Sequence, residues 1–236
     1  MKKIILFAAL IALVSFSYGQ SGQVKGTGPI VTKTLNLASF TTIECSMAAD
    51  LEVTQGATQK VEVEGQQNII DLINTEITEN KWKIKTPRGT WTEYDKLKIK
   101  VTLPTIYGLG MAGSGSIRSM NTIKTDDFQI GLSGSGKVDL SLEADAVDCG
   151  ISGSGNVNLK GHTKELVVAT SGSGDVTAFD FPASKVKIGM SGSGNIDVNA
   201  SESLDAAISG SGDVRYKGSP KVKAKVSGSG TVEPRN

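Results

Sequence analysis

Few residues in this sequence have side chains that could carry out chemistry, and they are widely spaced. The single histidine, His162, stands in the polar segment 160–164, where no motif supplies it with a nucleophile or further metal ligands. Asp175 and Asp213 each follow a copy of the tetrapeptide Ser-Gly-Ser-Gly. Two repeats apart, they would be separated by about 9.6 Å, near the upper limit for inverting glycosidases. Asn195 occupies the position between them, which favours a polar ladder over a catalytic pair.

The other charged residues give no stronger indication of a catalytic or metal site. Carboxylates also occur close together at residues 126–127, 143–145 and 202–205. These segments are polar connections, and solvent-exposed turns account for their charges. Residues 171–176, SGSGDV, are similar to glycine-rich calcium-binding repeats, but those repeats need adjacent glycines, which no copy has. Lysine and arginine total 25 against 24 acidic residues, without the basic excess of nucleic-acid-binding proteins. We predict a non-enzymatic protein with no metal, cofactor or nucleic-acid partner.

The two cysteines leave two interpretations open. Cys45 and Cys149 could form a disulfide in an oxidising compartment. Cys149, however, falls in an apolar column in which the other repeats carry Leu, Ile, Val or Ala. Free cysteine is commonly buried as a small hydrophobic residue, so the sequence favours buried thiols without a catalytic role.

Residues 1–19 have the organisation of a signal peptide. Lys2 and Lys3 precede the apolar run 4–14, and the small residues Ser17 and Gly19 suit cleavage after Gly19. The apolar run is too short for a good transmembrane span. We therefore predict an exported mature chain with no transmembrane segment, located in the periplasm, at the cell surface or in the medium.

The tetrapeptide Ser-Gly-Ser-Gly is the most prominent feature of the chain. It occurs seven times, the first time as Ala-Gly-Ser-Gly, with steps of 21, 19, 19, 20, 18 and 18 residues. A fixed period near twenty residues is typical of solenoids, in which each repeat buries its face against its neighbours.

Apolar and polar residues alternate on both sides of each tetrapeptide, which indicates β-strands. Equivalent apolar positions form continuous columns only if the strands of successive repeats stack in parallel. The sequence therefore predicts an all-β fold in which residues 104–236 form a parallel β-helix of 18–21 residues per coil. Two of the predicted inward columns, one and five residues before the tetrapeptide, are Met111, Leu132, Ile151, Thr170, Met190, Ile208 and Val226, and Tyr107, Phe128, Val147, Leu166, Val186, Leu204 and Val222.

The repeated glycines are predicted to form a corner of each coil. If the alternation continues through the tetrapeptide, both glycines face inward, where two converging walls leave no room for a side chain, and both serines face outward. A single bulge would exchange the two faces. The predicted corner glycines are Gly113, Gly115, Gly134, Gly136, Gly153, Gly155, Gly172, Gly174, Gly192, Gly194, Gly210, Gly212, Gly228 and Gly230.

Residues 20–103 lack the tetrapeptide but contain further alternating segments, for example 61–64, 82–85 and 97–101. We predict that this region forms degenerate early coils or a β-rich cap, continuous with the β-helix as one domain. Residues 69–77 are its only candidate for a short helix, and Trp82 is expected in the core.

Several segments together resemble a known bacterial family. They are the signal peptide, FTTIECSMAADLEVTQG at 40–56, KVEVEG at 60–65 and KLKIKVTLPTIYGLGMAGSG at 96–115, followed by the repeated SGSG. This combination resembles the family named putative auto-transporter adhesin, head GIN domain, over nearly the whole mature chain. The resemblance implies an exported β-helical protein acting in adhesion, and it offers no catalytic residues.

The predicted function is that of an adhesin of the cell envelope or surface, binding a glycan or protein partner through a solenoid face or the N-terminal cap. The alternatives are a structural spacer or self-associating envelope protein and, with less support, a polysaccharide-active β-helix enzyme. Copies are expected to associate, if they do, through the solenoid ends. The candidate binding residues are Trp91 and Tyr94 on the cap and, on the repeats, Ser135, Ser154, Ser173, Ser193 and Ser211.

Small residues also stand two positions before the tetrapeptide, where they would form a flat outward strip beside the serines. Crowding of the wall would explain them, and so would a surface that accepts another sheet, a glycan chain or a crystalline surface. The residues are Gly110, Gly131, Gly150, Ala169, Gly189 and Ala207.

Overall fold

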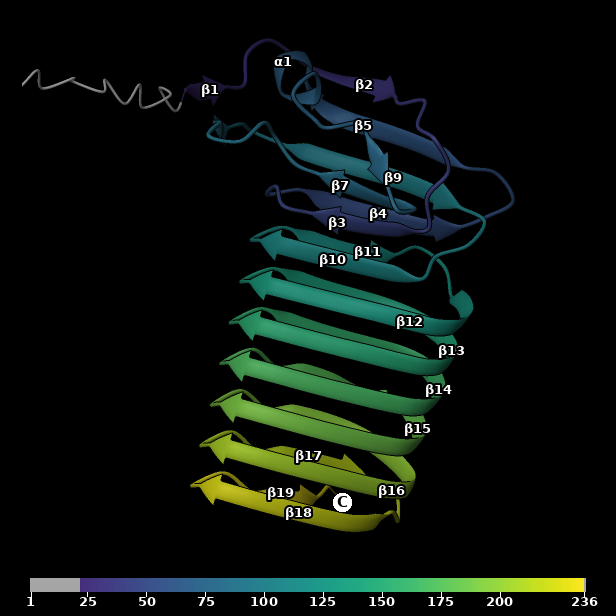
Figure 1. The fold of residues 1–236 in the computed structure, drawn as a ribbon, viewed down its shortest axis with the longest axis vertical. Coiled ribbons are helices and arrows are strands. Elements are labelled where there is room, and N and C mark those ends of the chain that lie inside the picture. Colours follow the sequence, from purple (N-terminus) through teal and green to yellow (C-terminus); the bar gives the residue numbers. More distant parts are fainter. Residues whose placement is uncertain (1–21, 236) are drawn as a thin grey trace, which may run out of the picture.

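The chain folds into a tall stack of parallel β-strands with a mixed β layer at its N-terminal end (Figure 1). This computed structural model describes residues 22–235, apart from the side chain of Trp91. The predicted signal peptide, residues 1–19, lies outside the described residues. The stack is the predicted parallel β-helix, and its rungs follow the SGSG repeats.

Each rung consists of one strand segment before the SGSG corner and one after it. We call the two faces that these segments build the pre-corner wall and the post-corner wall. Because the chain bends more gently at the far side of the coil, the four strands from β13 to β16 run continuously from one wall into the other. The strands are β10 (Gly108–Gly113), β11 (Ser116–Ser119), β12 (Ile123–Gly134), β13 (Lys137–Gly153), β14 (Asn156–Gly172), β15 (Val176–Gly192), β16 (Ile196–Gly210), β17 (Val214–Lys217), β18 (Lys221–Gly228) and β19 (Val232–Pro234).

The register confirms the predicted columns. Leu132 pairs with Ile151, which pairs with Thr170, and these side chains are buried between the walls. Tyr107 was wrongly assigned to such a column: it is 50% exposed, whereas Phe128, one rung further, is 1% exposed. The strand β10 begins only after Tyr107, so the preceding residue, Ile106, fills the core instead.

Val222 and Val226, at the C-terminal end of the same two columns, are also exposed, at 38% and 41%. They belong to β18, the last strand of the pre-corner wall in the described part of the chain. No further described rung covers them, so a buried column position becomes an exposed one at this end.

The corner glycines are required both by conformation and by space. The first glycine of every tetrapeptide has a φ between 110° and 141°, which L-residues with side chains rarely adopt. At Gly153 an added Cβ would lie 2.5 Å from the backbone oxygen of Gly134 in the preceding rung. At Gly155 it would lie 2.6 Å from the oxygen of Gly136 and from a methyl carbon of Leu132. The predicted crowding is therefore present, and much of it comes from the neighbouring rung.

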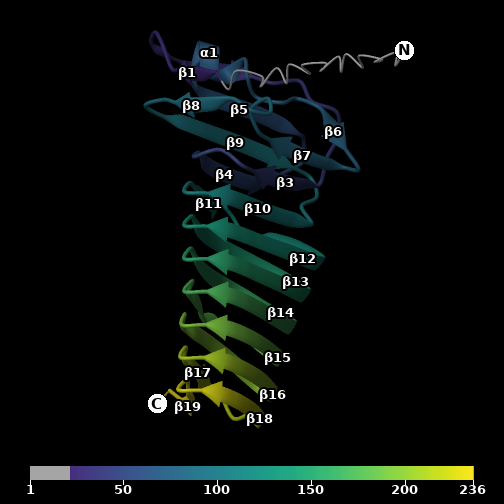
Figure 2. The ribbon, with the colours of Figure 1, turned by 60° about the vertical axis from the view of Figure 1, so that its left-hand side comes forward.

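The N-terminal region contains both predicted arrangements, early coils and a cap, but its coils are stacked out of sequence order. The strands β3 (Thr42–Cys45) and β4 (Asp50–Gln55) form a rung that pairs with β10 and β11. On their other side lie β7 (Lys81–Ile84) and β9 (Leu97–Leu103), which come later in the chain. Figure 2 shows this rung between the two later segments.

An antiparallel layer closes the N-terminal end of the stack. The strand β5 (Lys60–Gln66) pairs antiparallel with β9, and β2 (Ile30–Thr34) pairs antiparallel with β5. The parallel stacking therefore ends at β9, and the antiparallel layer covers the apolar interior of the rung that β7 and β9 form. Smaller elements complete it: α1 (Gln67–Ile70), β6 (Ile77–Thr78), and the separate pair β1 (Gln23–Lys25) and β8 (Trp91–Glu93).

Two local predictions for this region are tested by the structure. The helix expected within 69–77 is a single turn, α1, which begins two residues earlier. Trp82 is fully buried as predicted: its ring packs against Phe40 at 5.6 Å between centroids, and its Nε1 donates a hydrogen bond to the backbone oxygen of Asn74 at 2.8 Å.

The core contains one polar position that its surroundings do not satisfy. Thr170 is 6% exposed and occupies the inward column between Ile151 and Met190. Its hydroxyl has no hydrogen-bond partner among the described residues. Thr163, also buried, differs because its hydroxyl lies 3.0 Å from the backbone oxygens of Asp145 and Glu165.

Replacing a corner glycine should cost far more stability than replacing a glycine of the wall. We expect Gly153→Ala to destabilise the protein by about 1–3 kcal/mol, because it adds φ strain and a collision with the preceding rung. Gly189→Ala is the matched control, since an added Cβ there meets nothing within 4 Å. Chemical denaturation of the two variants measures the difference. Equal stabilities would contradict the rung-contact explanation of the corner.

Removing the unpartnered hydroxyl should stabilise the fold. We expect Thr170→Val, which keeps the shape of the side chain, to raise the free energy of unfolding by about 1 kcal/mol. Thr163→Val should lower it, because that hydroxyl is hydrogen-bonded. Urea denaturation of both variants provides the test, and a loss of stability in Thr170→Val would show that its hydroxyl is satisfied.

Candidate binding surface

The two aspartates considered for catalysis belong to a hydrogen-bonded ladder on the post-corner wall. Asp175 accepts hydrogen bonds from the backbone N–H of Asn195 at 2.7 Å and from its side-chain amide at 3.2 Å. Asp213 accepts hydrogen bonds from the backbone N–H and the hydroxyl of Thr231, at 2.9 and 2.8 Å. These contacts link successive rungs, so a structural role accounts for both carboxylates.

Ion pairs also account for the carboxylates near His162. His162 is adjacent to Glu143 in the register, and Lys124 lies 2.7 Å from the Glu143 carboxylate, which holds the pKa of Glu143 below its usual range. Lys164 pairs with Asp145 at 2.8 Å, and this contact raises the pKa of Lys164. Within residues 22–235, His, Cys, Asp and Glu side chains nowhere form a group of three placed to hold a metal ion.

Both cysteines are free and buried, which settles the question of the disulfide in favour of thiols. Burial raises the pKa of Cys149 to about 12. Burial also raises the pKa of Cys45, whose Sγ donates a hydrogen bond to the backbone oxygen of Met47. A thiol that is buried and remains protonated is a poor nucleophile, so neither cysteine is suited to covalent chemistry.

Of the two aromatic candidates on the cap, only Tyr94 has a side chain that the structure describes. Tyr94 is half-buried against the core, and its hydroxyl donates a hydrogen bond to the backbone oxygen of Ala48 at 3.1 Å. Burial raises the pKa of the Tyr94 hydroxyl. The side chain of Trp91 lies outside what the structure describes; its backbone forms part of β8. Tyr94 therefore offers only part of its ring to a ligand.

The second serines of the tetrapeptides, the predicted binding residues, lie in the corners rather than on a wall. Their side chains are exposed, and their backbone N–H groups donate to glycine oxygens of the preceding rung, for example from Ser154 to Gly134 at 2.9 Å. The first serines are the last residues but one of the pre-corner strands and face outward on the wall itself. Sequence reasoning did not single them out, although their position two residues after the small-residue strip indicates the same face.

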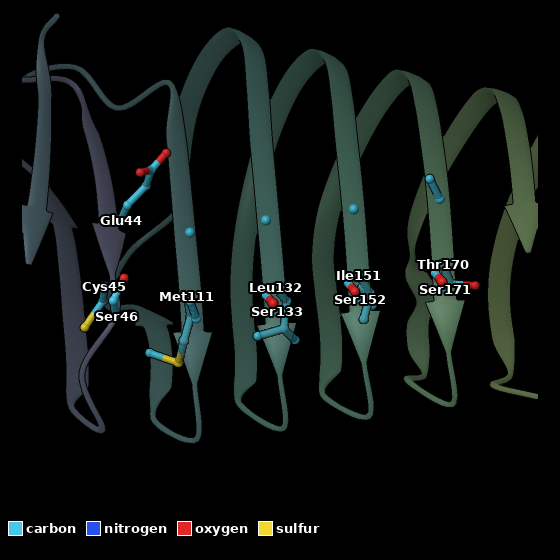
Figure 3. Close-up of a pocket in the computed structure, with 15 residues that line it drawn as sticks. Glu44, Cys45, Ser46, Met111, Leu132, Ser133, Ile151, Ser152, Thr170 and Ser171 are labelled. Carbon is cyan, nitrogen blue, oxygen red and sulfur yellow. The ribbon is translucent and has the colours of Figure 1, made fainter. Parts of the chain in front are cut away.

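A shallow groove of about 530 Å³ crosses the pre-corner wall at its N-terminal end (Figure 3). The small residues of β10, β12, β13 and β14 form its floor, the first serines lie along one side, and Glu44 stands at its end. Its outward-facing residues are Glu44, Ser46, Gly110, Ala112, Gly131, Ser133, Gly150, Ser152, Ala169 and Ser171.

A second hollow of about 380 Å³ continues the groove toward the start of the strands. Gln129, Asp148 and Val167 are among the residues that line it. At its N-terminal end the carboxylate of Glu44 is 2.5 Å from Nζ of Lys81. Together the two hollows form a shallow, largely apolar depression in the wall, with the Glu44–Lys81 ion pair at its N-terminal end.

The small residues of this strip are not imposed by crowding. An added Cβ would meet its nearest neighbouring atom at 4.0 Å at Gly131 and at 3.9 Å at Gly150, which are ordinary contacts, and nothing within 4 Å at Gly189. Only Gly110 is tighter, at 3.3 Å from Glu44. The wall has room for side chains along the strip, so the crowding explanation weighed from the sequence fails at these three positions. Their small size keeps the surface flat.

The arrangement is suited to contact with an extended chain or another flat surface. The backbone groups of its floor are paired within the sheet, so the floor offers a flat surface, while the hydroxyl groups along its side can form polar contacts with a partner. The lining residues form neither an acid–base pair nor a nucleophile with its base. Among residues 22–235, no helical segment has the length and hydropathy of a membrane span.

Comparisons with known proteins agree with this fold. A solved structure described as a putative adhesin from Bacteroides fragilis is 27% identical, with a TM-score of 0.83 over 90% of this chain and 100% of the other. A protein from Parabacteroides distasonis described as a putative lipid binding protein is 26% identical, with a TM-score of 0.74 over 91% of this chain and 100% of its own.

A putative adhesin from Parabacteroides merdae shares the fold at 24% identity, with a TM-score of 0.72 over 91% of this chain and 99% of the other. No curated protein matches the chain. Residues 39–220 match the family described as "Putative auto-transporter adhesin, head GIN domain". Because this match spans well over half of the sequence, the chain belongs to that family.

Proposed function

We propose that this protein is an exported, non-enzymatic adhesin that binds a protein or glycan partner through its pre-corner wall. The observation that carries the proposal is the strip of glycines with open space above them. From β10 to β16 the strip has room for side chains but carries none larger than a methyl group, and it offers a partner a flat floor beside a row of hydroxyl groups. Membership of an adhesin family supports the same function.

Export is part of the proposal. The organisation of residues 1–19 predicts a signal peptide, and proteins of an adhesin family act outside the cytoplasm. In an exported adhesin, reduced cysteines persist only where oxidants and partner thiols cannot reach them. The burial of Cys45 and Cys149 meets that condition.

A structural spacer is the second candidate function, and the hydrogen-bonded stack favours it. Each corner is tied to the preceding rung by a backbone hydrogen bond, and side-chain ladders such as Asn195 to Asp175 add further links. Bidentate contact of Arg215 with Asp197, at 2.7 and 3.0 Å, stiffens the C-terminal rungs in the same way. A stiff rod would hold a binding surface away from the cell, so the two functions are compatible.

A single lysine placed in the groove tests the binding function. We expect Gly150→Lys to weaken binding at least about tenfold, because its side chain fills the floor while its Cβ fits the fold. Thr177→Lys, on the post-corner wall, is the matched control and should bind normally. The probe is a panel of immobilised glycans, mucin and extracellular-matrix proteins, read by surface plasmon resonance.

The pattern of loss decides the location of the site. Saturable binding that survives Gly150→Lys but is lost in Tyr94→Ala would move the site to the N-terminal cap and contradict the wall. Equal losses in Gly150→Lys and Thr177→Lys would show that neither wall is specific. Absence of binding to every probe would leave the spacer function as the supported one.

A further inference from the structure

The outward charges of the pre-corner wall are divided between its two halves. Between the column of Asp127 and the corner, the three rungs from β12 to β14 carry only acidic charged residues on their outer face, whereas β15 and β18 carry only basic ones; the rungs of β10, β3 and β7 lie beyond this part of the wall. Asp205 on β16 is the one acidic residue of the C-terminal half. The residues are Asp127, Asp148 and Glu165 in the first half, and Lys185, Lys187, Lys221, Lys223 and Lys225 in the second.

The register places these charges in straight columns. Asp127 stands in the same column as Glu165, Lys185 and Lys221, at the start of the wall strands. Parallel in-register stacking spaces successive rungs by about 4.8 Å, so the charges in this column are separated by multiples of that spacing along the solenoid axis. Its acidic and basic ends are about 24 Å apart, further than a Debye length at physiological salt.

We propose that a second copy of this chain is the partner of the pre-corner wall, packed wall to wall with the two solenoid axes antiparallel. The inference rests on the proposed binding function and names its partner. The two-fold axis lies between the two facing walls, parallel to their strands, above the line between β14 and β15. It brings β14 of one copy onto β15 of the other, β13 onto β16, and β12 onto β18.

This arrangement makes the surface complementary to itself. Asp127 of each copy faces Lys221 of the other, and Glu165 faces Lys185, so each contact occurs twice as a two-fold interface requires. Asp148 and Asp205 are the one like-charged pair, and Lys223, 3.5 Å from Asp205 within its own chain, offsets it.

The small-residue strip supplies the steric half of the match. About the same axis Ala169 faces Gly189 and Gly150 faces Ala207, so no side chain larger than a methyl group stands in this column on the four central rungs; in the outer pair of rungs Gly131 faces Lys225. The contact is also large enough. Six rungs by seven residues cover roughly 650 Å² of flat wall, close to the roughly 800 Å² per partner of a standard interface.

Association through the solenoid ends, the arrangement expected from the sequence, would bring like charges together. Two β18 strands meeting edge to edge would place Lys221, Lys223 and Lys225 beside the same lysines of the other copy. Lysine on an exposed edge strand is a common means of preventing such pairing. The charges of this chain therefore oppose pairing at its end and favour pairing at its wall.

A charge exchange between Asp127 and Lys221 tests the interface. Both side chains are exposed and neither forms an ion pair with a described residue, so their replacement leaves the fold intact. Sedimentation velocity of residues 20–236 over a concentration series gives the dimer dissociation constant. We expect Asp127→Lys and Lys221→Asp each to raise it about tenfold or more, because each variant places like charges together twice.

Rescue distinguishes this interface from any other. The double variant Asp127→Lys, Lys221→Asp should dimerise like the unmodified chain. An equimolar mixture of the two single variants should form a heterodimer, since every facing pair is again oppositely charged. Lys160→Asp, on the post-corner wall, is the matched control and should not change the constant.

Other outcomes overturn the proposal. A chain that remains monomeric at all concentrations excludes it, and a dimer that ignores both single variants uses another surface. Either result leaves the proposed function standing if Gly150→Lys still abolishes binding to the immobilised panel. Loss of dimerisation in Gly150→Lys, together with rescue by the charge exchange, supports the wall as a surface for a second copy.

Discussion

The backbone of one corner lies so close to the next that no side chain fits between them, and the rest of the structure depends on this contact. An added Cβ at Gly172 would lie 2.4 Å from the oxygen of Gly153, and the next rung repeats the contact at a shorter distance still. Because every corner stacks directly on the preceding one, the strands leave the corner in register. Inward columns such as Val138 on Val157 follow from that register rather than from side-chain shape alone.

The same register determines the outer surface. Residues at equivalent positions of each repeat become neighbours about 4.8 Å apart, so a preference repeated in the sequence becomes a continuous stripe in space. On the post-corner wall the stripes are hydrogen-bonded ladders, as from Asn195 to Asp175. On the pre-corner wall the stripe of small residues leaves a flat surface beside accessible hydroxyl groups. One wall thus strengthens the stack, and the other is free to contact a partner.

The charged residues make the two ends of the pre-corner wall different, although its strip of small residues is uniform. A stripe of glycine, alanine and serine looks alike from either end, and it would let a partner slide by one rung at little cost. Acidic residues near β12 and lysines near β18 distinguish the two ends. Fixed charges of this kind set the register of an association more than its strength. The basic edge of β18 also discourages pairing at the end of the stack.

The solenoid could be predicted from the amino-acid sequence, because its period, its alternation and its corner glycines are local features that each repeat carries. The burial of Trp82 and the polar ladder around Asn195 could be predicted in the same way. The stacking of β3 between β10 and β7, and of β4 between β11 and β9, could not be predicted, since strand order in space depends on long-range pairing that no local pattern encodes. Tyr107 is exposed for a related reason, because its rung begins one residue later than the repeat implies. The open space above Gly150 and Gly189 likewise became visible only with the neighbouring rungs in place, since crowding is a property of atoms brought together by the fold.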